Sequence, residues 1–88
     1  MALFTVILEF DGGTYISQFH ASSPGDAAGK HADYLGGLKG MSTPTSRRRL
    51  ADRLSLEPPV AIEGMRKVWC RSASVGKKLA LVNIVATA

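Results

Sequence analysis

Cysteine and histidine are the residue types that could supply a nucleophile and its base, and this chain has Cys70, His20 and His31. No local motif joins the cysteine to either histidine, so a Cys–His pair would depend on proximity in the fold. Free cysteine is also among the most buried residue types in proteins. We therefore interpret Cys70 as a structural thiol, and a cysteine-dependent enzyme is the weakest of three hypotheses.

The other residues that could perform chemistry lack a suitable spacing. The seven acidic residues show no spacing typical of a catalytic pair, and two histidines with one cysteine are too few to indicate a metal site. The stretch SVGKK at residues 74–78 lacks the earlier glycine and the following serine or threonine of a phosphate-binding loop. We expect no catalytic residue, no metal and no cofactor, and therefore a protein that is not an enzyme.

Basic residues give the strongest remaining signal. Residues 1–35 hold one basic and four acidic residues (net −3), whereas residues 36–88 hold ten basic and three acidic residues (net +7). Either the two halves attract each other, or the second half meets an anionic partner. The candidate nucleic-acid-binding residues are Arg47, Arg48, Arg49 and Arg53, which could neutralise phosphates without sequence preference. No aromatic residue alternates with them and no nucleic-acid-binding motif is present, so a solvated basic face is the competing interpretation.

A β-hairpin is the first element expected to position these residues. One face of residues 3–10 carries only apolar side chains: Phe4, Val6, Leu8 and Phe10. A two-residue turn, on Gly12-Gly13 or on Asp11-Gly12, sets this face beside the apolar face of the next strand, whereas a three-residue loop would spoil the match. The opposite face is mixed, and we interpret His20 there as a surface residue.

Two helices should follow the hairpin. The stretch SSPGD at residues 22–26 offers a capping serine, Ser23, with a proline suited to the first helical position and an acid suited to the helix N-terminus. We expect His31 at the boundary of this helix and a left-handed stop at Gly36-Gly37. Residues 38–46 are predicted to be a loop.

The second helix is predicted to begin at a cap formed by Thr45 or Ser46 and to run through Leu56, before the two prolines. This start would place three consecutive arginines, residues 47–49, in the first turn. The helix dipole disfavours positive charge there. Neutralisation by acids of the first half, an anionic partner or a weak helix are the three explanations that the sequence leaves open.

A second strand pair should complete the fold. Residues 60–63 and 65–71 are predicted to be strand with a possible bulge at Gly64, and residues 72–76 are predicted to be a hairpin connection. Residues 78–87 are apolar on both faces, which is typical of a central strand. Asn83 is the exception and needs a partner if it is buried. Trp69 is interpreted as a core anchor rather than a ligand platform.

The expected order is ββααββ, two β-hairpins bracketing two helices. This order predicts an α+β fold with one antiparallel or mixed sheet and helices on one face, in a single domain over residues 1–88. No apolar run is long enough to span a bilayer, and the first residues are too acidic for a secretory signal. We expect a soluble, cytoplasmic protein.

Residues 4–35, through EFDGGTYIS and SSPGDAA, loosely resemble the N-terminal part of HicB-type antitoxins, in which a strand pair with an acidic-glycine turn precedes a helix. The proline-rich Gly-Cys segment of that family is missing here, and no functional residue is carried over.

These patterns favour a small non-enzymatic binding or interaction domain whose partner is an unknown protein or a second copy of the chain. Self-association could use the C-terminal strand if that strand lies at a sheet edge. The alternative is an electrostatic nucleic-acid-binding protein that uses the basic helix around Arg47 and Arg53.

Overall fold

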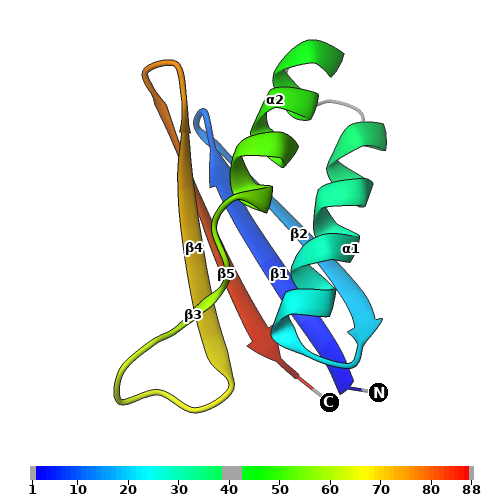
Figure 1. Ribbon diagram of the computed structural model, residues 1–88, viewed down its shortest axis with the longest axis vertical. Helices are drawn as coiled ribbons and strands as arrows, with labels where there is room; N and C mark the ends of the chain where they lie inside the picture. Colours follow the sequence, from blue (N-terminus) through cyan, green and yellow to red (C-terminus); the bar gives the residue numbers. More distant parts are fainter. Residues whose placement is uncertain (1, 39–42, 88) are drawn as a thin grey trace.

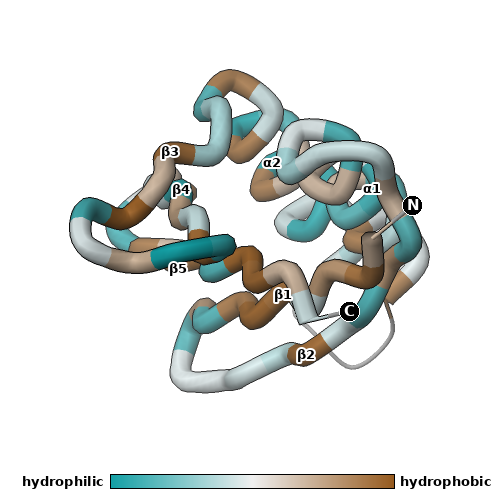
Figure 2. The backbone as a smooth tube through the Cα atoms, turned by 90° about the horizontal axis from the view of Figure 1, so that it is seen from below, coloured by the Kyte–Doolittle hydropathy of each residue, from teal (hydrophilic) through white to brown (hydrophobic). Residues whose placement is uncertain are grey.

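The computed structural model describes residues 2–38 and 43–87, which form five strands and two helices. The elements are β1 (Ala2–Phe10), β2 (Gly13–Ala21), α1 (Pro24–Gly37), α2 (Pro44–Ser55), β3 (Val60–Ala61), β4 (Val68–Val75) and β5 (Lys78–Ala86). The strands form one antiparallel sheet in the order β2-β1-β5-β4-β3, and both helices lie on the same side of it (Figures 1 and 2). The predicted α+β fold is confirmed, with β3 a very short strand.

The turn of the first hairpin lies on Asp11-Gly12. Phe10 pairs with Gly13, so the second of the two predicted turn positions is the one observed. Both turn residues have positive φ angles, 50° for Asp11 and 80° for Gly12. Two consecutive positive φ angles suit the right-handed twist of the flanking strands, which is why the two-residue turn keeps the apolar faces of β1 and β2 together.

The second hairpin differs from the prediction. Strand β4 continues through Val75, and the turn lies on Gly76-Lys77, so residues 72–76 are not a connection. The alternation of Ala73 and Val75 with serines makes this segment a regular strand, because the small polar residues point away from the core. At the hairpin ends, Lys78 Nζ lies 2.9 Å from an Asp11 carboxylate oxygen, which joins the basic half to the acidic half.

The segment between α2 and β4 contains less strand than expected. Strand β3 covers only Val60–Ala61, and β4 begins at Val68 rather than at residue 65. Gly64 lies in the connecting loop with a φ angle of 80°, so the predicted bulge is wrong. The left-handed backbone at Gly64 and at Lys67 turns the chain between the two strands.

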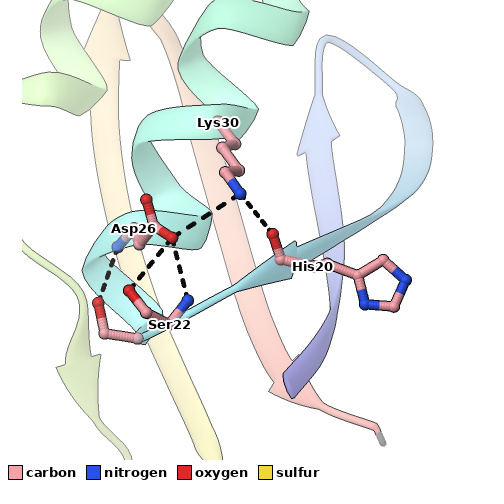
Figure 3. Close-up of polar contacts among 5 residues, drawn as sticks. His20, Ser22, Asp26 and Lys30 are labelled. Atoms are coloured by element: carbon pink, nitrogen blue, oxygen red, sulfur yellow. Dashed lines mark hydrogen bonds and ion pairs between the residues drawn. The ribbon is translucent and has the colours of Figure 1, made fainter. Parts of the chain in front are cut away.

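Helix α1 begins as predicted. Ser23 Oγ accepts a hydrogen bond from Asp26 N at 3.0 Å, and the Asp26 carboxylate accepts one from Ser22 N at 3.0 Å. This hydrogen bond, with Lys30 nearby, holds the pKa of Asp26 below its usual value. Lys30 also donates to the His20 carbonyl, which ties α1 to the outer strand β2 (Figure 3).

The predicted left-handed stop of α1 is wrong. Gly37 is the last helical residue, and neither Gly36 nor Gly37 is among the described residues with a positive φ angle. The helix ends instead at Leu38, whose backbone is extended (φ −72°, ψ 118°) and whose N–H donates to the Leu35 carbonyl. Leu38 is partly buried and packs against the core.

Helix α2 begins earlier than predicted. Thr43 is the N-cap and its hydroxyl accepts from Ser46 N at 3.1 Å, so Thr45 and Ser46 are helical rather than capping residues. Part of the predicted loop, residues 39–42, lies outside the described residues. Because the helix starts at Pro44, the three consecutive arginines follow the first turn. The predicted conflict with the helix dipole is therefore largely removed.

The core lies between the two helices and the sheet. Its fully buried side chains come from every layer: Val6, Leu8, Leu35, Leu50, Leu54, Val82 and Ile84. Trp69 packs at the edge of this core with its ring centroid 6.0 Å from that of Phe4, as expected of a core residue. Within the described part of the chain, no helix is long and apolar enough to cross a membrane.

Strand β5 is the third of five strands, so the prediction that it is central is confirmed. Its backbone pairs with β1 on one side and with β4 on the other. Self-association through the edge of β5 is therefore excluded, because no unpaired strand edge is left there.

Candidate interaction surface

The sheet has one face covered by the helices, the helix face, and one face that no described helix or strand covers, the open face (Figure 2). Burial alternates along the strands accordingly, with buried residues on the helix face. The open face consists of alternate residues of four strands: Leu3, Thr5, Ile7, Glu9, Thr14, Ile16, Gln18, His20, Val68, Cys70, Ser72, Ser74, Leu79, Leu81, Asn83 and Val85.

The open face mixes exposed aliphatic side chains with uncharged polar ones and carries little charge. Ile16 is 65% exposed, Leu79 56% and Leu81 43%, and Val60 on the edge strand β3 is 60% exposed. Among the sixteen residues that define the open face, Glu9 is the only acidic one, and none is a lysine or an arginine. Several large aliphatic side chains exposed on one face of a sheet are a feature of interaction sites.

A single row of side chains crosses the middle of the open face. The strand registers align Ile16 of β2, Ile7 of β1, Asn83 of β5, Cys70 of β4 and Val60 of β3. Asn83 therefore stands at the centre of the sheet with apolar neighbours on both sides. Within the described residues its carboxamide has no hydrogen-bond partner, and it is half-buried rather than enclosed.

A groove of about 370 Å³ lies at the end of this row that is formed by β4 and β3. Its middle is formed by Cys70 and Ser72, which are small, while the flanking strands contribute larger residues. The flanking residues are Leu81 and Asn83 from β5, and Val60 and Ile62 from β3 and the residue that follows it. Glu57 and Pro58, from the segment between α2 and β3, also line the groove. The groove can accept an aliphatic side chain that approaches the open face.

The cysteine and the histidines do not form a pair. Cys70 is half-buried on the open face, whereas His31 belongs to α1 and is buried between that helix and the sheet. His20 does lie on the open face, but β2 and β4 are three strands apart, which is about 14 Å. The described residues also contain no cluster of three or more potential metal ligands. The geometry therefore gives no support to a Cys–His nucleophile.

Two polar residues are buried between the sheet and the helices. His31 is buried rather than at a boundary as predicted, and its ring stacks on Tyr34 with centroids 6.3 Å apart. Burial lowers the pKa of His31 to about 4, and the charge of Arg71 acts in the same direction. The His31 imidazole is therefore neutral at physiological pH, and its Nδ1 has no hydrogen-bond partner within the described residues.

Arg71 fixes both helices to the sheet. Its two terminal nitrogens donate to the Leu54 carbonyl of α2 at 2.9 Å and to the Ala28 carbonyl of α1 at 3.1 Å. Burial lowers the pKa of Arg71, but a guanidinium keeps its proton in proteins. Both bonds use its charge to satisfy helix carbonyls, so we assign Arg71 to the fold rather than to ligand binding.

The four predicted nucleic-acid-binding arginines lie on α2, away from the open face. Arg49 and Arg53 are exposed and four residues apart on the helix, so they share one side of it. Arg48 instead lines a polar cleft between the helices together with Asp33 and Asp52. Arg47 is half-buried. The structure thus brings two of the four together, with acidic residues beside a third.

The groove was not predicted from the sequence, whereas Asn83 was identified as the polar exception of its strand without a face being assigned to it. The one available signal was the apolar character of residues 78–87 on both faces, which we interpreted only as the mark of a central strand. A central strand that is also apolar toward an uncovered face indicates an interaction surface. The sequence does not show which face the helices cover.

Comparisons with known proteins add no assignment to this surface. No protein-family model, no curated protein and no solved structure matches the chain.

Proposed function

We propose that the protein is a small, non-enzymatic interaction domain that binds another protein surface through the open face of its sheet. One observation carries the proposal: exposed aliphatic side chains and a groove share a face that no described helix or strand covers. Burial of such side chains against a partner removes apolar area from water, which is the main source of free energy in protein association.

The electrostatics of the open face support a protein partner over a nucleic acid. Nucleic-acid-binding surfaces need lysines and arginines to neutralise phosphates, and this face has none. A cytoplasmic location is part of the proposal, because Cys70 is a free thiol and a reducing compartment preserves free thiols.

Site-specific photocrosslinking in cells tests the proposal. A photoreactive amino acid at Ile16 or Leu81 should form covalent adducts with protein on irradiation. The same group at Leu56 is the matched control, because Leu56 is an exposed aliphatic residue that is not part of the open face. Adducts from Leu56 with none from Ile16 and Leu81 would contradict the proposal.

Nucleic-acid binding remains the second candidate, favoured by the exposure of Arg49 and Arg53 on one side of α2. It requires binding of DNA or RNA at low salt that weakens steeply as salt is added. Replacement of Arg47, Arg48, Arg49 and Arg53 by alanine should then abolish binding. Lack of binding at low salt would remove this candidate and leave the first unaffected.

A further inference from the structure

We infer that the partner on the open face is a second copy of this chain, packed sheet against sheet about a two-fold axis parallel to β5. The inference rests on the proposed function and names its partner. It draws on four features of the open face: its shape, its central residue, its charge and its area.

The two halves of the open face differ in shape. On one side of β5, the paired residues Ile7 and Ile16 form an aliphatic ridge across β1 and β2. On the other side, the groove lies over Cys70 and Ser72. A ridge on one side of β5 and a groove on the other, each with aliphatic side chains, are what a self-complementary surface requires.

A two-fold axis parallel to β5 brings ridge and groove together. The rotation sets β5 against β5, β1 against β4 and β2 against β3, because it reverses the strand order and keeps the level along the strands. At the level of the central row, Ile7 of one copy then faces Cys70 of the other, and Ile16 faces Val60. The same contacts occur twice, once on each side of the axis.

Asn83 occupies the position on the axis. A carboxamide has both donors and acceptors, so two copies related by the axis can hydrogen-bond to each other. This pairing would satisfy the one central polar group that has no partner within the described residues. A partner of different sequence would have to supply a matching polar group at the same point, whereas a second copy supplies it by symmetry.

Charge and area are also compatible with a second copy. The rotation places the Glu9 carboxylate opposite the Ser72 hydroxyl, so the only acidic residue of the open face meets a hydrogen-bond donor. Strand spacing and rise give the face an area of about 600 Å². Two such faces bury about 1,200 Å², which reaches the size of specific protein interfaces.

Analytical ultracentrifugation of the full chain, from micromolar to millimolar concentration, tests the inference. We expect a reversible monomer–dimer equilibrium. Leu81→Lys should raise the dissociation constant about tenfold or more, because Leu81 lies on the central strand and faces its own copy across the axis, so the charge would be buried in the interface. Leu56→Lys is the control and should change the constant less than about twofold, since rim and remote charges contribute little. A monomer at every concentration, or equal effects of both variants, would overturn the inference.

A cysteine crosslink tests the orientation. Within one chain, residues 7 and 70 lie two strands apart, about 10 Å, which is beyond the reach of a disulfide. Between copies they face each other, so Ile7→Cys should give a covalent dimer under mild oxidation. The dimer should be lost when Cys70→Ser is added. A dimer that persists with Cys70→Ser, or wild-type protein that crosslinks equally well, contradicts an axis parallel to β5.

The proposed function and the inference of a second copy can be refuted separately. Photocrosslinks from Ile16 to a different protein, with a purified chain that stays monomeric, would refute the second copy and leave the interaction domain intact. An absence of adducts from the open face in cells, again with a monomeric chain, would refute both.

Discussion

The two faces of the sheet are built from alternate residues of the same strands, yet they serve different purposes. On β5, Ala80, Val82 and Ile84 are buried against the helices, whereas Leu79 and Leu81 are exposed on the open face. On the helix face, Arg71 donates to two helix carbonyls, although the His31 Nδ1 there has no hydrogen-bond partner within the described residues. On the open face, the Asn83 carboxamide has no hydrogen-bond partner within the described residues. Apolar content alone therefore does not distinguish a core from an interface, whereas the presence of covering elements does.

The largest expected difference between the faces is in how much the free energy of unfolding falls when a leucine is truncated to alanine. Leu8→Ala leaves a cavity under the helices, because Leu8 has no exposed surface, and should lower the free energy of unfolding by about 2–5 kcal/mol. Leu79→Ala on the open face should cost less than about 1 kcal/mol, since that side chain is largely in water. Urea denaturation at a concentration where the chain is monomeric measures both. Equal costs would mean that the two faces are equally buried.

The buried histidine of the helix face should make stability depend on pH. Because burial lowers the pKa of His31 from 6.5 to about 4, the unfolded chain binds a proton that the folded chain does not bind in this range. The contribution of the neutral imidazole is complete above pH 6.5 and is lost as the pH falls toward 4, for a total of about 3 kcal/mol.

Unfolding measured from pH 7 to pH 4 checks this dependence. His31→Gln should flatten the decline, while His20→Gln, on the exposed open face, should leave it as in the wild type. A decline unchanged by His31→Gln would show that the imidazole is not held neutral by burial.

The arginine that links sheet and helices should matter more than an exposed one. A lysine at position 71 has one nitrogen in place of the two that contact the helix carbonyls, so Arg71→Lys should lower the free energy of unfolding by about 2 kcal/mol. Arg66→Lys, in the exposed loop before β4, should change it by less than about 0.5 kcal/mol. Thermal denaturation distinguishes the two. A similar small effect of both would argue against Arg71 as the link between the layers.

The smallest expected difference concerns serine hydroxyls. Ser23→Ala removes the N-cap of α1 and should cost about 1 kcal/mol. Ser72→Ala on the open face removes a hydroxyl exposed to water and should be close to neutral for the isolated chain. Helical content and unfolding midpoint, measured by circular dichroism, compare them. The comparison fails if Ser72→Ala is the more destabilising change.

Much of the fold could be predicted from local patterns. The alternation in residues 3–10 and the SSPGD stretch were sufficient for β1 and the start of α1, because turn and cap preferences act over a few residues. The apolar run in residues 78–87 indicated the central position of β5. Local signals decided these elements without knowledge of tertiary contacts.

The remaining elements depended on local signals that are compatible with more than one structure. Thr43, Thr45 and Ser46 are all acceptable caps, and Pro44 at the first helical position favours Thr43. Ser72 and Ser74 resembled turn residues, but their strand is fixed by pairing with Leu81 and Leu79. The candidate surface could not be predicted for the same reason. The row through Asn83 joins residues from five strands, and only the sheet order brings them together.

A concentration series of methyl NMR spectra tests most directly the claim that the open face is the interface and the helix face is the core. We expect the methyl resonances of Ile7, Ile16, Leu79 and Leu81 to shift or broaden as the concentration rises, while those of Leu35, Leu50 and Leu54 stay fixed. Shifts confined to the helix residues, or no shift of any methyl group up to millimolar concentration, would contradict the claim.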